Sequence, residues 1–362
     1  MTLSRGAIGN LVNRYRAVLR KCRMMNVFGS LAVAGMLVAG NAGFAGAEEL
    51  SGDISPISLS GDTRNIIGVG DISLRSTEPA LRYLINVSGQ GQLDISMSNG
   101  SPMAVGNADG IYLKDYSDYD QYASAFHVAG SGSSGSFVGT GTFSMVGGGK
   151  LLGVCAFLSE SKGTLTLSGD ITGEAEAVMN GSNGYASFVA AAAGGNLVFG
   201  GDRTTLRAKA STGNNANGAF VKYGGMIGFA SKSVLIESKN TDSNSVGINC
   251  ADGTVKTSAD TDLDIVVEGN KATTGIQLTA SSSDVQLAGN LDLTATQTGQ
   301  DSFASVLGIS NDSGKMVVSG PTSLRLVTNA PFDAKGITAS GKADMSFLGD
   351  VEIAVTGSAS GS

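Results

Sequence analysis

The stretch DVQLAGNLDLTATQTGQDSFASVLGIS, residues 284–310, decides the fold. It opens with a short alternating run and turns at Gly289-Asn290, where both residue types tolerate a positive φ. From Leu291 to Ala295 it alternates again, with the apolar side chains on one face and the polar ones on the other. A polar loop at 298–301 separates this run from a third one at 306–310. The segment therefore predicts three short strands.

The same unit recurs along the chain with a fixed spacing. A first marker, usually glycine followed by a polar residue, occurs at Gly70-Asp71, Gly169-Asp170, Gly201-Asp202, Ser231-Lys232, Ala259-Asp260, Gly289-Asn290, Gly320-Pro321 and Gly349-Asp350. A second glycine follows each of the six markers from Gly169-Asp170 to Gly320-Pro321, at Gly184, Gly218, Gly247, Gly275, Gly308 and Gly336. From residue 169 onward the first markers lie about 28–32 residues apart, and two features that keep one period indicate a true structural repeat.

A repeat of three short strands predicts an all-β protein, a right-handed parallel β-helix (β-solenoid) with about 30 residues per coil. Strands of successive coils would pair about 4.8 Å apart, and stacking would make the apolar interior continuous. The composition agrees, since aromatic residues are 6% and Gly reaches 53. A β-sandwich also has short strands and many turns, but its strands need not share a sequence phase.

Residues 1–47 have the pattern of a signal peptide. The basic residues of this region all lie within the first 23 positions, at Arg5, Arg14, Arg16, Arg20, Lys21 and Arg23. The apolar run 27–38 and the small residues Ala45-Gly46-Ala47 follow, in the order of a hydrophobic region and a cleavage site. We expect a helical signal peptide cleaved after Ala47, with Ala45 as the alternative cleavage site and a membrane anchor as the alternative interpretation.

The basic part of this leader is long and specific in sequence. The run NRYRAV, residues 13–18, precedes the hydrophobic stretch by about ten residues and resembles the extended signal peptide of type V secretion proteins. That family comprises autotransporters and two-partner exoproteins. Leu19 stands where the family usually has Trp, and the run does not begin at the first Met, although a GTG start at Val12 would restore that position.

The resemblance also covers the repeat, since autotransporter passengers have the β-helix architecture. It implies the Sec translocon and signal peptidase as partners, and an outer-membrane barrel or transporter in cis or in trans. An autotransporter ends in such a barrel, and the residues up to Ser362 do not include one. The resemblance thus leaves three alternatives: a gene that continues, a truncated chain, or a separate transporter.

Charge and spacing give the domain organisation. Removing 1–47 leaves 18 basic and 31 acidic residues, a net charge near −13, so we do not expect the chain to bind nucleic acid. We expect an extended signal peptide over 1–47, irregular N-terminal solenoid coils with a cap over 48–160, and regular solenoid repeats over 161–362, without a C-terminal barrel.

One segment stands out as a candidate ligand-binding loop. Four of the eight Tyr lie within eleven residues and alternate with Asp; the candidate residues are Tyr112, Asp115, Tyr116, Asp118, Tyr119, Asp120 and Tyr122. Rings that stack on sugars and carboxylates that accept hydroxyl hydrogen bonds would suit a carbohydrate, and carboxylates also suit Ca²⁺. The alternative is an insertion that packs over the edge of a coil.

Other candidate residues carry weaker signals. Asp260, Asp262 and Asp264 alternate and predict an acidic stripe on one strand face, either a metal or sugar site or a solvated surface. His127, the one histidine, is expected to be a solvent-facing strand residue, and no nucleophile motif surrounds any Ser. We therefore expect no catalytic residues, no metal and no cofactor.

The cysteines are expected to be unpaired. Cys155 and Cys250 are about three repeat units apart, which separates their backbones by roughly 14 Å along a solenoid axis. A disulfide needs Cα atoms within about 7 Å. Cys250 is expected to face the interior together with Ile248.

These patterns favour an exported β-solenoid on the cell surface, at the outer membrane or secreted, which acts as an adhesin or structural stalk with glycans or a host surface as partners. One alternative is a polysaccharide lyase or glycosidase on a parallel β-helix, with its acids at 260–264 or 115–120. Another is a two-partner-secreted exoprotein or a surface-layer component.

Overall fold

The computed structural model describes residues 47–76, 81–98, 100–107, 122–147, 153–178, 186–211, 215–299, 304–329 and 333–357. They belong to one compact unit, 46–362. The described residues form 26 β-strands and no helix, so none of them contributes an apolar helix of membrane-spanning length. The all-β prediction is confirmed, while the expected leader helix lies outside the described residues.

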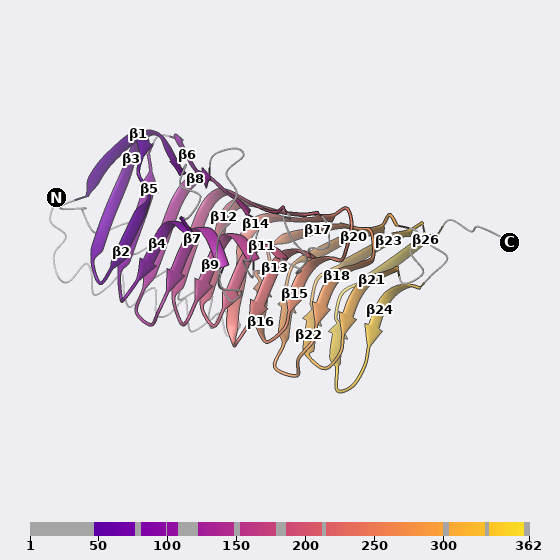
Figure 1. Cartoon of the computed structure of the whole chain (residues 1–362). Coiled ribbons are helices and arrows are strands. Elements are labelled where there is room, and N and C mark those ends of the chain that lie inside the picture. Colours follow the sequence, from indigo (N-terminus) through magenta and orange to yellow (C-terminus); the bar gives the residue numbers. More distant parts are fainter. Residues whose placement is uncertain are drawn as a thin grey trace, which may run out of the picture. The chain divides into compact units, whose positions relative to one another are not determined.

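All strands belong to two parallel sheets that run the length of this unit. The ten-stranded sheet contains β2 (Ile57–Ser60), β4 (Tyr83–Ser88), β7 (Tyr122–Ala129), β9 (Gly153–Glu160), β11 (Ala186–Ala193), β13 (Asn215–Lys222), β15 (Ser245–Cys250), β18 (Ala272–Leu278), β21 (Ser305–Asn311) and β24 (Ala334–Ala339). Each of these strands pairs only with its counterparts in the coils before and after it. Figure 1 shows the strands laid side by side in chain order.

The 16-stranded sheet supplies the other two sides of each coil. Its long strands are β3 (Thr63–Ser76), β8 (Ser134–Gly147), β10 (Thr164–Ala177), β12 (Asn196–Ala210) and β14 (Gly225–Asn240). Its short strands are β1 (Glu48–Ile54), β5 (Gln92–Met97), β6 (Pro102–Asn107), β16 (Gly253–Thr257), β17 (Asp262–Gly269), β19 (Asp284–Leu287), β20 (Asn290–Gln297), β22 (Lys315–Val318), β23 (Thr322–Thr328), β25 (Asp344–Phe347) and β26 (Val351–Gly357).

A long strand in one coil corresponds to two short strands in another. The first half of β14 pairs with β16 and its second half pairs with β17. Together with one strand of the ten-stranded sheet, each coil therefore has three strand segments. The sequence prediction of three strands per coil in a parallel β-solenoid is confirmed.

Glycines form columns at the bend between the first two sides of the coil. Gly139 pairs with Gly169, and both have a positive φ, +135° and +119°. A Cβ on Gly349 would lie 2.5 Å from the carbonyl oxygen of Gly320, so these two coils approach too closely for a side chain at residue 349. The marker predicted at Ala259-Asp260 was wrong by two residues, because Asp262 is the residue that pairs with Asn290.

A ladder of isoleucines fills the interior of the ten-stranded sheet. Ile248, Ile276, Ile309 and Ile337 pair in sequence across β15, β18, β21 and β24, at spacings of 28, 33 and 28 positions. The first three are fully buried. Burying each such side chain contributes about 1.5–3 kcal/mol, so the repeated inward position accounts for much of the stability of each coil.

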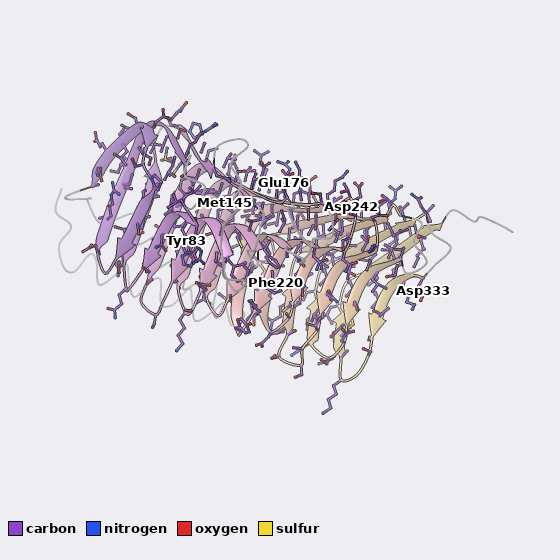
Figure 2. All side chains as sticks on the ribbon, viewed as in Figure 1. Tyr83, Met145, Glu176, Phe220, Asp242 and Asp333 are labelled. Carbon is purple, nitrogen blue, oxygen red and sulfur yellow. The ribbon has the colours of Figure 1, made fainter. Side chains whose placement is uncertain are left out.

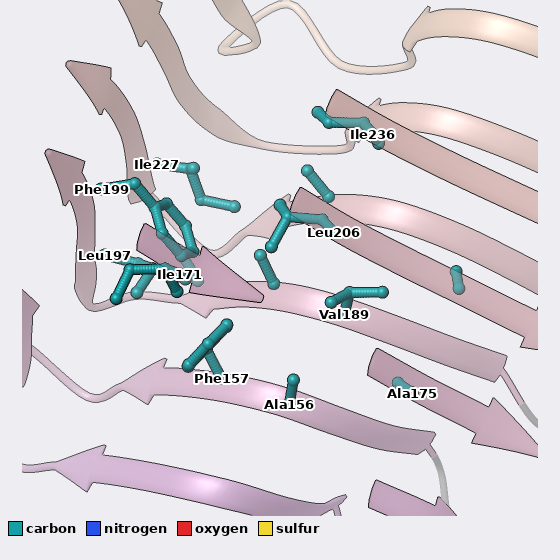
Figure 3. Close-up of a cluster of buried hydrophobic side chains, with 14 of the residues drawn as sticks. Ala156, Phe157, Ile171, Ala175, Val189, Leu197, Phe199, Leu206, Ile227 and Ile236 are labelled. Atoms are coloured by element: carbon teal, nitrogen blue, oxygen red, sulfur yellow. The ribbon is translucent and has the colours of Figure 1, made fainter. Parts of the chain in front are cut away.

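The core near the middle of the unit is aromatic instead of aliphatic. Phe143, Phe157, Phe199 and Phe229 follow one another with ring centroids 5.0, 5.4 and 5.5 Å apart, within the range of favourable aromatic pairs. Figure 3 shows Phe157 and Phe199 pointing into the space between the strands. Gly173 leaves the room that the Phe157 ring occupies, since a Cβ there would lie 2.5 Å from that ring.

One coil is longer than the others. Steps between paired residues of the ten-stranded sheet are 28–33 positions, but Ile85 and Phe126 are 41 positions apart. The additional residues lie between β6 and β7, where the Tyr- and Asp-rich segment was identified. The segment is thus an insertion into the solenoid path, and coils continue across residue 160 because β9 pairs with β11.

Replacing Gly289 with Ala should destabilise the solenoid. The new Cβ would collide with the backbone carbonyl of Thr261 in the preceding coil, and such overpacking costs about 1–3 kcal/mol. The control is Gly200→Ala, because the nearest atoms to a Cβ at Gly200 are 3.8 Å away. Urea unfolding followed by circular dichroism measures both. Equal midpoints for the two variants would contradict the close stacking at this corner.

Candidate binding site

The ten-stranded sheet has a region that is buried on both faces. Strands β9 and β11 read GVCAFLSE and ASFVAAAA, and every residue in them except the last is buried. One set of side chains joins the main core. The other set faces outward and forms a second apolar cluster, which we call the outer cluster: Tyr122, Cys155, Leu158, Ala186, Phe188 and Ala191.

The strand register shows how the outer face changes along the unit. One outward column runs through Ser58, Asn86, His127, Leu158, Ala191, Phe220, Asn249, Gln277, Ser310 and Thr338. The column is polar at both ends and apolar at Leu158, Ala191 and Phe220. Aromatic and charged side chains gather around this apolar part, and Figure 2 labels Tyr83 and Phe220 among them.

His127 lies in this region and is not a solvent-facing residue, so that prediction was wrong. Its side chain is 5% exposed, and its ring stacks on Tyr83 with centroids 3.9 Å apart. Nδ1 lies 2.8 Å from Asn86 Oδ1 and Nε2 lies 3.0 Å from Glu160 Oε1. It does point outward from its strand, but neighbouring coils enclose it, because long side chains on adjacent coils are only one strand spacing apart.

Lys222, the last residue of β13, contacts three aromatic side chains at the far end of this region from His127. Its ammonium group donates a hydrogen bond to the Tyr122 hydroxyl at 2.5 Å. The same nitrogen lies 4.9 Å from the ring centroid of Tyr122, 5.6 Å from that of Phe220 and 4.6 Å from that of Tyr223. These distances suit cation–π attraction, so the cation holds three rings around itself.

Two aromatic contacts and one arginine complete the arrangement. Phe188 stacks on Phe220 with centroids 4.6 Å apart and meets Tyr122 edge-on at 6.0 Å. Arg82 donates hydrogen bonds to the Tyr83 hydroxyl at 2.8 Å and to the Tyr122 carbonyl oxygen at 3.0 Å. The side chains of five coils are therefore fixed against one another on a single flank.

Burial and hydrogen bonding in this region shift the pKa values of several ionisable side chains. The hydrogen bond from His127 is the largest influence on the pKa of Glu160 and lowers it, while partial burial opposes the shift. Burial raises the pKa of Tyr83 to about 12 and raises that of Tyr122 further. Burial likewise raises the pKa of the Cys155 thiol. At neutral pH the flank thus presents neutral phenols and a neutral thiol.

The predicted Tyr- and Asp-rich loop is described only at its last residue. Tyr112, Asp115, Tyr116, Asp118, Tyr119 and Asp120 lie outside the described residues. Tyr122 is 7% exposed and belongs to the outer cluster. Its position is fixed by contacts with Lys222, Arg82 and Phe188.

The acidic stripe is only partly formed. Asp262 and Asp264 lie in β17, whereas Asp260 lies in the turn before it. Asp264 pairs with Asp292 of the next coil, and partial burial, followed by the charges of Asp292 and Asp262, raises the pKa of Asp264. Within the described ranges no group of three His, Cys, Asp or Glu side chains could hold a metal ion.

The predictions for the cysteines are confirmed. Cys155 and Cys250 are both free and buried. Cys155 pairs in register with Phe188, then Asn217, then Val246, and Val246 shares β15 with Cys250, so the two thiols are three coils apart. Cys250 faces the main core with Ile248.

Comparison of the chain with protein-family models, with curated proteins and with solved structures found no match. The fold and site alone therefore define the class. The protein is a parallel β-solenoid that carries a packed aromatic and charged cluster on one flank.

Glu160→Gln should remove a pH-dependent part of the stability. Because the folded-state pKa of Glu160 is lowered, its contribution is present above the unfolded pKa near 4.3 and is lost as pH falls through the folded value. A hydrogen bond to a charged group contributes about 1.5–3 kcal/mol. Urea midpoints at pH 7 and pH 3 are the measurement, with Asp333→Asn as the exposed control. The gap between wild type and Glu160→Gln should be largest at pH 7 and should shrink as the pH is lowered to 3. A constant gap would argue against the hydrogen bond between His127 and the Glu160 carboxylate.

Neither Cys155 nor Cys250 should react with a thiol reagent in the native protein, because the thiolate is the reactive form and burial raises the pKa of both thiols. In 6 M urea, a concentration chosen to unfold the chain, both should react. Peptide mass spectrometry after brief labelling distinguishes the two sites from Cys22. Rapid native labelling of Cys155 would show that the outer cluster is open.

Proposed function

We propose that this chain is an exported surface protein of the autotransporter-passenger type, and that its solenoid acts as a scaffold or adhesin. The observation that carries the proposal is the continuous stack of parallel coils from β1 to β26. In a solenoid each coil contacts its neighbours, so adding coils extends a flank without changing the core. Such a body suits the display of binding groups at a distance from a membrane.

The leader pattern supports export. Basic residues, an uncharged apolar stretch and small residues before Glu48 follow the order expected of a signal peptide. The acidic remainder of the chain suits an extracellular protein that stays soluble through its net charge. The run 13–18 adds the resemblance to type V secretion proteins.

We propose a binding role in preference to a catalytic one. The chain has one histidine, and the imidazole of His127 is enclosed by Tyr83, Asn86 and Glu160, which occupy its ring face and both nitrogens. General acid–base catalysis would need that group within reach of a substrate. Fixed rings and cations on one flank are more suited to recognition.

The proposed export predicts the N-terminal residue of the mature protein and its exposure on the outside of the cell. The mature protein should begin at Glu48 and should be labelled on intact cells by a membrane-impermeant amine reagent, with a cytoplasmic protein as the unlabelled control. Ala47→Phe should block cleavage at this site, because signal peptidase requires a small residue there. Ala17→Phe is the matched control in the basic region. A full-length, unlabelled cytoplasmic chain would overturn the proposal.

A further inference from the structure

The last described coil, which consists of β24, β25 and β26, leaves one edge of each strand unpaired. In the part of the chain that the structure describes, β26 pairs only with β23, and Figure 1 shows it as the last strand of the stack. Its inward side chains Val351, Ile353 and Val355 are 41%, 45% and 51% exposed. Leu324 and Leu326, which pair with Ile353 and Val355 in the preceding coil, are fully buried. The face thus has the apolar pattern of a coil interior.

Strand β26 is a regular template for pairing with another strand. Its register with β23 runs from Val351 to Gly357 without a bulge, and the strand contains neither proline nor lysine. Bulges, prolines, lysines and inward-pointing charges are the features that protect natural edge strands. The one charged residue of the strand, Glu352, alternates with the inward residues and therefore lies on the outward face. Backbone groups and an apolar face are both available to a partner strand.

The first coil, by contrast, has protective features at its edge. Strand β1 contains a register shift between Leu50 and Gly52. Glu48 pairs with Ile66, a buried core residue, so a carboxylate occupies an inward column there, and it forms an ion pair with Arg64. An inward-pointing charge and a bulge are known to prevent an edge from adding strands. The first and last coils therefore differ in their capacity to pair with another chain.

Stacking the first coil of one copy on the last coil of another would bring like charges together. The register followed from coil to coil places Asp53 and Glu352 in the same outward column, so the two carboxylates would lie opposite each other. Asp264 opposite Asp292 shows the effect within this column, since burial and then the charge of Asp292 raise its pKa. Glu48 would also be buried between the coils.

Strand β26 complements a second copy of itself in the antiparallel direction. When the two-fold axis passes through Ala354, Ile353 of one copy lies opposite Val355 of the other, so inward residues face inward residues. In the same register Glu352 lies opposite Thr356, and no two charges of the paired strands meet. The apolar faces of the two end coils then cover each other. A two-fold pairing of this kind closes with two copies.

We propose that two copies of this chain associate end to end through their β26 strands, as an antiparallel, two-fold symmetric dimer. The sheet that begins with β1 continues across the axis into the second copy. The association extends the contact that every coil already makes with its neighbour. The inference is independent of the proposed export and adhesin role, because it uses only the described strands.

The test is the molecular mass of the purified chain, measured by analytical ultracentrifugation over a range of concentrations. Wild type should form a dimer that dissociates on dilution, and no longer species. Thr356→Glu should weaken the dimer about tenfold, because the symmetry creates its contact with Glu352 twice. Thr356→Lys is the matched variant and should tighten the dimer by about the same factor, since it places opposite charges at the same contact. Circular dichroism checks that both variants keep the fold.

Asp53→Asn, at the edge of the first coil, is the control, and its dimer Kd should stay within about twofold of wild type. A chain that is monomeric at every concentration overturns the inference. A dimer with equal Kd for Thr356→Glu and Thr356→Lys also overturns it, because the contact then lies on another surface. Open-ended polymers that Asp53→Asn strengthens would overturn it as well, since they would indicate head-to-tail stacking of the first coil on the last.

Discussion

The structure depends on one constraint, which is that every coil must pair its backbone in register with the coil before and the coil after it. Parallel strands from β2 to β24 hydrogen-bond in one continuous order, so a position in one coil determines the surroundings of the same position in the next. At the corners of the last coils, a Cβ on Gly289, Gly320 or Gly349 would lie 2.0, 2.3 or 2.5 Å from a backbone oxygen of the preceding coil. This is why Gly289, Gly320 and Gly349 lie over one another, and why Ile248, Ile276 and Ile309 form a ladder.

The same constraint produces the candidate site. Outward side chains on successive coils are as close as inward ones, so several large residues in one outward column bury one another. In β7, β9, β11 and β13 this creates the outer cluster and the enclosed His127–Glu160 pair. In the preceding coil the outward column has the small residue Ser58 instead, and an open groove remains beside Tyr83. The flank therefore combines a rigid support and an adjacent open space.

The repeat spacing in the sequence predicted the solenoid fold, because each coil repeats the same inward-facing and corner positions. Gly169, Gly289 and Gly349 were recognised from spacing alone, and Cys250 was assigned to the interior from its neighbour Ile248. The marker near residue 260 was displaced by two residues, because Thr261 replaces the glycine and the local spacing no longer identifies the corner. His127 was misjudged, because its environment consists of Tyr83, Asn86 and Glu160, which lie 33 to 44 positions away in sequence. The continuous apolar runs of β9 and β11 were the available signal for a sheet covered on both faces.

The most direct test of stacked coils is a set of distances along one outward column. Spin labels at Ser58→Cys and Thr338→Cys, in a chain with Cys22→Ser, are nine coil steps apart and should give about 43 Å by pulsed electron resonance. Labels at Ser58→Cys and Gln277→Cys are seven steps apart and should give about 34 Å. Distances that grow in this ratio support the account. Two similar distances, or a Ser58–Thr338 distance well under 30 Å, would contradict a solenoid built by stacking one coil on the next.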